Sequence, residues 1–188
     1  MRIISGKFKK KKLFLPDSTM TRPLRDYVKE SLFNQLLHSK IIKFNFNNSI
    51  ILDIFSGSGS FGIECLSRGS KKIYFVENNI KVIKILLKNI NSIKIENKVE
   101  IIKNDFLKKS VSSILKESFN LIFLDPPFNY QYWDKLLKKI KLFKKSSPEC
   151  IVVLHYEEKN SFVFEEHLKI ISKKKYGVSV ICFAKLKE

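Results

Sequence analysis

The feature that most constrains the fold of this 188-residue chain is a regular alternation of apolar, strand-like runs with helical patterns. Five short apolar runs have the composition of buried strands: 50–54, 72–77, 99–105, 119–125 and 150–155. Between them, apolar residues recur every three or four positions, as expected for amphipathic helices. This alternation predicts an α/β fold, Rossmann-like, with a doubly wound and mostly parallel sheet. Two last runs, 168–173 and 178–186, predict an antiparallel hairpin at its C-terminal edge.

The first 44 residues precede this alternating region and have a different pattern. Residues 1–16 predict an extended hairpin that turns near Ser5 and Gly6. A helix is expected to follow, starting at 21–23, where a proline suits the first turn. Its apolar positions recur every four residues: Leu24, Val28, Leu32 and Leu36. We therefore expect a small basic N-terminal extension over 1–44 and a second domain over 45–188.

The net charge of +18 is unevenly distributed along the chain. Residues 1–25 hold eight Lys or Arg against one Asp, so positive charge is densest at the N-terminus. Such a concentration attracts phosphates, and the planar guanidinium group suits phosphates and base edges. A solvated basic arm is the plainer interpretation; we place binding of nucleic acid ahead of it, although not on charge alone. The side chains expected to bind nucleic acid are Arg2, Lys7, Lys9, Lys10, Lys11, Lys12, Arg22 and Arg25.

Composition also argues against several classes of protein and favours a cytoplasmic one. No apolar run approaches the roughly 18 residues that span a bilayer, and lysines at 9–12 precede any segment resembling a signal peptide. The cysteines are too widely spaced for a disulfide or zinc framework: Cys65, Cys150 and Cys182. The histidines lack metal-ligand spacing and are interpreted as structural: His38, His155 and His167. We expect no metal, and a monomer.

The turn after the first predicted strand is rich in glycine. Residues 57–62 read GSGSFG, which satisfies the G-x-G-x-x-G pattern, so a nicotinamide-dependent dehydrogenase is one alternative. Asp53 stands four residues before Gly57, where a carboxylate would repel a pyrophosphate. The same carboxylate would attract the ammonium and sulfonium groups of S-adenosylmethionine. Charge therefore favours S-adenosylmethionine over a dinucleotide.

Four successive predicted strands end in an acidic residue: Asp53, Glu77, Asp105 and Asp125. In a doubly wound sheet the carboxyl ends of the strands border the crevice that binds ligands. One such acid is a common turn former, but four in succession indicate a binding site. Glu77 is expected to accept hydrogen bonds from both ribose hydroxyls. Asp105, which follows Asn104, is expected to accept one from the adenine amine.

The most specific motif is Asp-Pro-Pro-Phe at 125–128. A nucleobase amine is a poor nucleophile because its lone pair is delocalised into the ring. The Asp125 carboxylate and the Pro126 carbonyl would accept its two N–H groups and localise that lone pair, and two prolines stiffen the turn. Phe128 offers a face on which a flipped-out base can stack. A rigid turn with a packed phenylalanine is the alternative, which the glycine turn upstream makes less favourable.

Together these motifs resemble the RsmD family of 16S rRNA guanine-N2 methyltransferases, which are class I, Rossmann-like enzymes. Four segments carry the resemblance, in order along the chain: RIISGKF at 2–8, TRPLRDYVKESLFNQL at 21–36, DIFSGSGSFGIE at 53–64 and LDPPF at 124–128. It covers essentially the whole chain. Two departures fall in the N-terminal extension: lysines at 9–12 occupy a stretch where the family often has a second glycine, and Leu24 stands where threonine is usual.

The resemblance implies S-adenosylmethionine as cofactor, and 16S rRNA or the small ribosomal subunit as partner. It implies that the target guanine is held by Asp125, Pro126, Pro127 and Phe128. The implied cofactor contacts are Asp53, Phe55, Ser56, Gly57, Gly59, Glu77, Asn78, Asn104, Asp105 and Phe106.

Three alternatives differ in what they would require of the sequence. An amino-methyltransferase acting on DNA adenine or cytosine, or on another RNA, would use the same turn. Sequence-specific DNA readers need a recognition surface, however, and only the first 44 residues lie outside the predicted catalytic core. A dehydrogenase would need a substrate domain. A non-catalytic RNA-binding protein would need neither the glycine turn nor the four acids.

Overall fold

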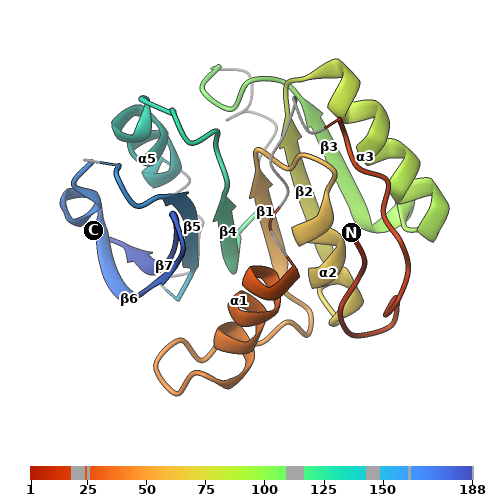
Figure 1. The fold of residues 1–188 in the computed structure, drawn as a ribbon, viewed down its shortest axis with the longest axis horizontal. Coiled ribbons are helices and arrows are strands. Elements are labelled where there is room, and N and C mark those ends of the chain that lie inside the picture. Colours follow the sequence, from red (N-terminus) through yellow and green to blue (C-terminus); the bar gives the residue numbers. More distant parts are fainter. Residues whose placement is uncertain (18–23, 25, 109–116, 143–148, 161, 188) are drawn as a thin grey trace.

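The computed structural model describes residues 1–17, 24, 26–108, 117–142, 149–160 and 162–187. Its centre is a twisted seven-stranded sheet (Figure 1). The strands are β1 (Ile50–Ile54), β2 (Lys72–Glu77), β3 (Val99–Lys103), β4 (Leu121–Leu124), β5 (Ile151–Glu157), β6 (Leu168–Tyr176) and β7 (Ser179–Leu186).

The strands lie in the order β3-β2-β1-β4-β5-β7-β6. The first five are parallel, whereas β7 runs antiparallel to both β5 and β6. This arrangement confirms the predicted mostly parallel sheet with an antiparallel C-terminal hairpin. The strand order reverses between β1 and β4, and at such a point the loops diverge and leave a crevice beyond the carboxyl ends of the strands.

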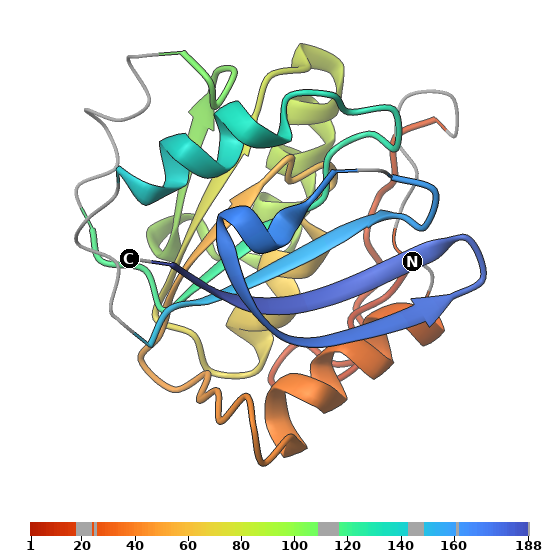
Figure 2. The ribbon, with the colours of Figure 1, turned by 90° about the vertical axis from the view of Figure 1, so that its left-hand side faces the viewer.

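Helices cover both faces of the sheet (Figures 1 and 2). One face carries α1 (Asp26–His38), α2 (Ser60–Ser67) and α3 (Ile80–Ile93), and the other carries α5 (Trp133–Lys141). Two short 3-10 turns, η1 (Glu96–Lys98) and η2 (Phe164–Glu166), join neighbouring elements.

Two apolar clusters, one on each face, hold these layers together. Successive strand residues alternate between them, so Ile51 packs in the cluster under α1, α2 and α3, while Leu52 packs in the cluster under α5. Both side chains are fully buried. This alternation within apolar strands explains why both faces of the sheet require a helical cover.

Some element boundaries differ from the sequence-based expectation. The third strand ends at Lys103 rather than at 105 because the next two side chains favour a turn: Asn104 accepts a hydrogen bond from the backbone N–H of Asp105, and Asp105 accepts one from Leu107. The predicted helix start at 21–23 lies outside the described residues, as does most of the helix expected between the third and fourth strands.

The N-terminal arm, residues 1–15, folds back on itself as predicted, although Arg2 and Lys12 form only an isolated antiparallel bridge. The backbone N–H of Ile3 donates to the carbonyl of Lys11 over 2.9 Å. Ile3 and Leu13 are buried in the cluster that contains α1, α2 and α3. The division between 1–44 and 45–188 stays a prediction. None of the described helices has the length and apolarity needed to cross a bilayer.

Candidate active site

A cavity of about 990 Å³ lies beyond the carboxyl ends of the central strands. It is bordered by the turns after β1, β2 and β4 and by the segment after β3. All four acids predicted from the strand ends line it: Asp53, Glu77, Asp105 and Asp125. Four carboxyl groups therefore line one cavity, together with Lys29 and Lys135, in a chain whose net charge is +18.

The glycine turn between β1 and α2 has a backbone that only a few residue types adopt easily. Gly57 and Gly59 have φ of 56° and 79°, and Phe55 is also left-handed at 64°. The hydroxyl of Ser56 donates to the carbonyl of Asp53 over 2.7 Å, which closes the turn. A Cβ on Gly62 would lie 2.4 Å from a ring carbon of Phe75, so glycine there lets α2 approach β2 closely.

Glu77 holds this turn from the neighbouring strand. One of its carboxylate oxygens accepts from the N–H of Gly57 over 3.0 Å, and the other accepts from Asn78 and Asn79, each over 2.9 Å. The side chain thus lies against the glycine turn and borders the cavity. Sequence reasoning placed Glu77 in the site but did not reveal these backbone partners.

Asp53 is the most deeply buried acid of the site, with 1% of its surface exposed. Its carboxylate accepts a hydrogen bond from the N–H of Gly62 over 3.1 Å. Burial raises the pKa of Asp53 well above its usual value, and the nearby charges of Asp125 and Glu77 raise it further. A cationic ligand would relieve this cost.

The Asp-Pro-Pro-Phe turn follows β4, and all four of its residues line the cavity. An oxygen of Asp125 lies 2.7 Å from Nδ1 of His155, which comes from β5. The rings of Phe128 and His155 meet edge to face, with their centroids 5.5 Å apart. His155 was interpreted from the sequence as a structural histidine, but its place near the carboxyl end of a strand beside β4 was a usable signal.

Tyr130 is a second residue that sequence reasoning missed. Its ring meets Phe55 edge to face, at a centroid distance of 5.2 Å, and it lines the cavity. Its hydroxyl oxygen is buried and has no hydrogen-bond partner among the described residues. Burial and the charge of Asp105 raise the pKa of Tyr130, so the group remains a neutral donor at physiological pH. A buried donor without a partner suits a site that a ligand completes.

The predicted cofactor contacts divide into two sets. Those that line the cavity are Asp53, Phe55, Ser56, Gly57, Glu77, Asn78 and Asp105. The others are not among its lining residues: Gly59, Asn104 and Phe106. Gly59 instead lies under α3, where an added Cβ would be 2.4 Å from Leu86. Phe106 is 2% exposed and packs in the apolar cluster under α5.

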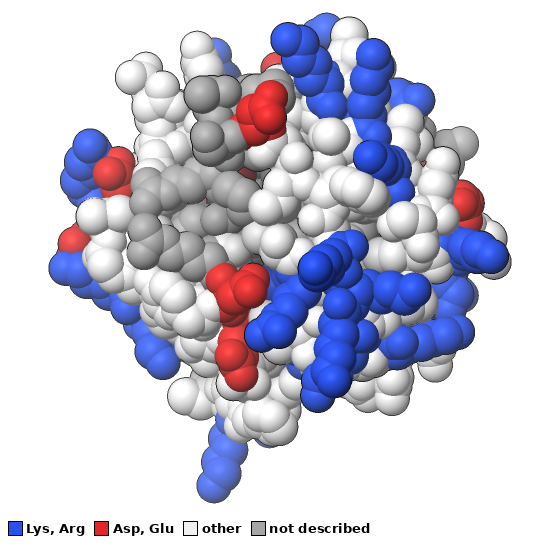
Figure 3. Space-filling view, turned by 45° about the vertical axis from the view of Figure 1, so that its right-hand side comes forward, with Lys and Arg blue, Asp and Glu red and all other residues white. Residues whose placement is uncertain are grey.

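None of the described basic side chains predicted to bind RNA is among the residues that line the cavity. Those on the arm are exposed: Arg2, Lys7, Lys9, Lys10, Lys11 and Lys12. Arg22 and Arg25 lie outside the described residues. Figure 3 shows Lys and Arg crowded on the side of the molecule that carries the arm.

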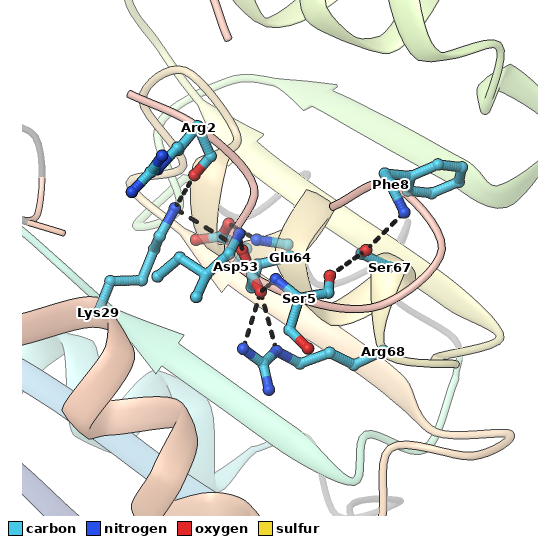
Figure 4. A network of polar contacts seen from close by, with 10 residues as sticks. Arg2, Ser5, Phe8, Lys29, Asp53, Glu64, Ser67 and Arg68 are labelled. Carbon is cyan, nitrogen blue, oxygen red and sulfur yellow. Dashed lines mark hydrogen bonds and ion pairs between the residues drawn. The ribbon is translucent and has the colours of Figure 1, made fainter. Parts of the chain in front are cut away.

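A buried carboxylate, Glu64 on α2, docks the arm (Figure 4). It is fully buried and accepts from the backbone N–H groups of Ile4 and Ser5 over 2.8 and 3.0 Å. The guanidinium of Arg68 pairs with it at 2.9 Å.

Lys29, also fully buried, lies 3.8 Å from Glu64 and donates to the carbonyl of Arg2. Desolvation lowers the pKa of Lys29. Lys29 also borders the cavity, so this network extends from the arm to the site.

Asn89 on α3 makes a second connection between the arm and the site. Its side-chain oxygen accepts from the N–H of Phe14 over 2.8 Å. Its amide nitrogen donates to the carbonyl of Phe14 over 3.0 Å and to that of Ser58, in the glycine turn, over 2.9 Å. The amide is fully buried, and both N–H groups and the oxygen are satisfied.

Comparison with known proteins identifies the family. A family model described as "Conserved hypothetical protein 95" matches residues 1–185. The chain is 31% identical over 182 residues to ribosomal RNA small subunit methyltransferase D of Haemophilus influenzae, covering 95% of this chain and 90% of the relative. The chain belongs to the RsmD family.

Solved structures agree with this assignment. The crystal structure of HI0767 from Haemophilus influenzae is 28% identical to this RsmD-family protein and superposes with a TM-score of 0.74, covering 100% of this chain and 99% of that one. The ribosomal protein L11 methylase of Lactobacillus delbrueckii subsp. bulgaricus shares the fold, with a TM-score of 0.66 at 14% identity, over 98% of this chain and 90% of its own. The RsmD-family protein is therefore a methyltransferase with the class I fold.

Proposed function

We propose that this RsmD-family protein transfers a methyl group from S-adenosylmethionine to the exocyclic N2 amine of a guanine in 16S rRNA. One observation carries the proposal: Asp125, held by His155 at 2.7 Å, borders the same cavity as the glycine turn and its acids. The RsmD-named relative supports small-subunit rRNA as the acceptor. We expect the protein to act as a monomer in the cytoplasm.

The residues of the cavity fit S-adenosylmethionine in their chemistry. Asp53 and Glu77 supply carboxylates for an ammonium group and for ribose hydroxyls, and Asp105 supplies an acceptor for the adenine amine. The unpartnered hydroxyl of Tyr130 leaves a donor for a ligand to accept. When bound, S-adenosylmethionine supplies an electrophilic methyl group on a sulfonium.

The Asp-Pro-Pro-Phe turn prepares the acceptor amine. We assign the Asp125 carboxylate and the Pro126 carbonyl to the two N–H groups of the amine, so that its lone pair is localised on the nitrogen. Phe128 stacks on the base, and Pro127 stiffens the turn. Asp125 takes the proton that the nitrogen loses once it has gained the methyl group. His155 keeps the carboxylate oriented and is a positioning residue.

The N-terminal arm is proposed to hold the RNA. Its exposed lysines lie outside the cavity, where they can neutralise phosphates while the target base enters the site. RNA read by shape and charge requires less additional protein than a specific DNA sequence does, which suits a chain of this length.

The test is transfer of labelled methyl from S-adenosylmethionine to unmodified 16S rRNA and to small subunits, followed by nucleoside analysis. Label recovered as N2-methylguanosine supports the proposal, and Asp125→Ala serves as the inactive control. Label recovered in another nucleoside, or only in DNA or tRNA, would contradict the assignment of the acceptor while leaving the enzyme class in place.

A further inference from the structure

Helix α3 carries a row of three exposed lysines, Lys81, Lys84 and Lys88, which we call the α3 lysine row. Their spacing of three and four residues places them on one face of the helix, opposite the buried face that includes Leu86 and Ile90. The helix contains no Asp or Glu. The row therefore presents positive charge alone to solvent.

The row lies next to the cavity at one end and next to the N-terminal arm at the other, the two parts of the molecule that contact RNA in our proposal. At its first end, Asn79 and Val82 border the cavity and flank Lys81. At its other end, the ammonium of Lys88 lies 3.8 Å from the ring centroid of Phe14 in the arm. Asn89 fixes the same part of the arm to α3. The α3 lysine row thus connects the cavity with the basic arm along one side of the molecule, where Figure 3 shows Lys and Arg gathered.

The lysines of the row differ in pairing from several exposed lysines of the C-terminal half. Several exposed lysines of α5, β6 and their surroundings lie within 3.4 Å of a carboxylate: Lys138 of Asp134, Lys159 of Glu157, Lys173 of Glu165 and Lys175 of Glu158. Within the described part of the chain, no carboxylate pairs with the α3 lysine row or with the arm lysines 7 and 9–12.

Helix stability does not account for the row either. Lys81 lies in the first turn of α3, where the helix dipole disfavours a cation. Like charges three and four residues apart also repel one another along the row. An external anion would remove both costs.

We propose that the α3 lysine row binds the phosphate backbone of the RNA next to the target base and guides the strand from the arm to the cavity. This inference rests on the proposed function and adds a surface to it. RNA is the partner that fits, because the row lies between an arm and a cavity that serve the same substrate.

The experiment compares two triple variants that remove the same charge. Lys81→Gln/Lys84→Gln/Lys88→Gln changes the row, and Lys159→Gln/Lys169→Gln/Lys187→Gln changes exposed lysines near the C-terminal strands. Affinity for an unmodified 16S rRNA fragment is measured over a range of salt concentrations. Each lost phosphate contact lowers the magnitude of the slope of log K against log salt by about 0.7–0.9, so the row variant should lose about 2–3. Its affinity for S-adenosylhomocysteine should stay within about twofold of wild type.

An unchanged slope in the row variant, or an equal loss in the control variant, overturns the inference. Methylation of 16S rRNA by the wild-type protein is measured in parallel. If the wild type methylates rRNA while the row variant binds it normally, the inference about the α3 lysine row is wrong and the proposed function stands. If the wild type neither binds nor methylates rRNA, both fail.

Discussion

Nδ1 of His155 lies 2.7 Å from a carboxylate oxygen of Asp125, joining strand β5 to the turn that follows β4. His155 is 5% exposed and its ring also meets Phe128, so one buried imidazole contacts both the acid and the aromatic residue of the turn. A carboxylate held in this way has little freedom to rotate. Catalysis that depends on orienting an amine benefits from such a fixed acceptor.

Replacing Asp125 or His155 should separate chemistry from cofactor binding. Asp125→Ala should abolish methyl transfer and leave affinity for S-adenosylmethionine within about tenfold. His155→Ala should lower kcat by on the order of 10–100-fold, since a misplaced acceptor costs that much. His155→Asn places an amide where Nδ1 lies and should restore much of kcat. Single-turnover kinetics and calorimetry measure both effects, and an Asn variant as slow as the Ala variant would contradict a positioning role.

The raised pKa of Asp53 predicts that cofactor binding depends on pH. In the free protein the buried carboxyl keeps its proton to a higher pH than usual. A ligand ammonium favours the carboxylate, so the pKa falls on binding and a proton is released between the two pKa values. Affinity for S-adenosylhomocysteine, which retains the ammonium, should therefore rise with pH across that interval. Calorimetry in buffers of different ionisation enthalpy detects the released proton, and Asp53→Asn should remove the pH dependence.

Tyr130→Phe should have opposite effects on stability and on binding. It removes a buried hydroxyl that has no partner among the described residues, and such a group costs about 1–3 kcal/mol. The free energy of unfolding should therefore stay the same or increase. Affinity for S-adenosylmethionine should fall by about 2–10-fold, because the ligand loses one hydrogen bond. Urea unfolding and calorimetry test the pair of effects, and unchanged binding would remove Tyr130 from the cofactor site. Tyr132→Phe, at a more exposed tyrosine on the same cavity, is the matched control.

Glu64→Ala should destabilise the protein by about 3–5 kcal/mol, the usual cost of removing one partner of a buried ion pair. Without the carboxylate, the N–H groups of Ile4 and Ser5 lose their acceptor and the buried cation of Lys29 loses its partner. Urea unfolding measures the loss, and Glu96→Ala, at an exposed acid, should change stability by less than about 1 kcal/mol. A loss in Glu64→Ala no larger than in this control would show that the arm is held by other contacts.

The sequence predicted the parts of the fold that depend on short-range patterns. The alternation of strands and helices follows from periodicity within each segment, and the glycine and Asp-Pro-Pro-Phe turns are defined by adjacent residues. The Asp125–His155 contact was missed because it joins residues thirty positions apart on neighbouring strands. The contacts of Glu64 with Ile4 and of Asn89 with Phe14 span 60 and 75 residues. No periodicity reveals contacts between such distant segments; they follow from how the arm packs against α2 and α3.

The three hydrogen bonds of the Asn89 side chain have a consequence for which substitutions this position can accept. A replacement must supply one acceptor and two donors to backbone groups of Phe14 and Ser58, and only an amide side chain offers that set. Because the contacts with the arm are to its backbone, they do not depend on the side chain at position 14. The arm can therefore vary in sequence there, whereas position 89 cannot vary without disturbing the arm and the glycine turn together.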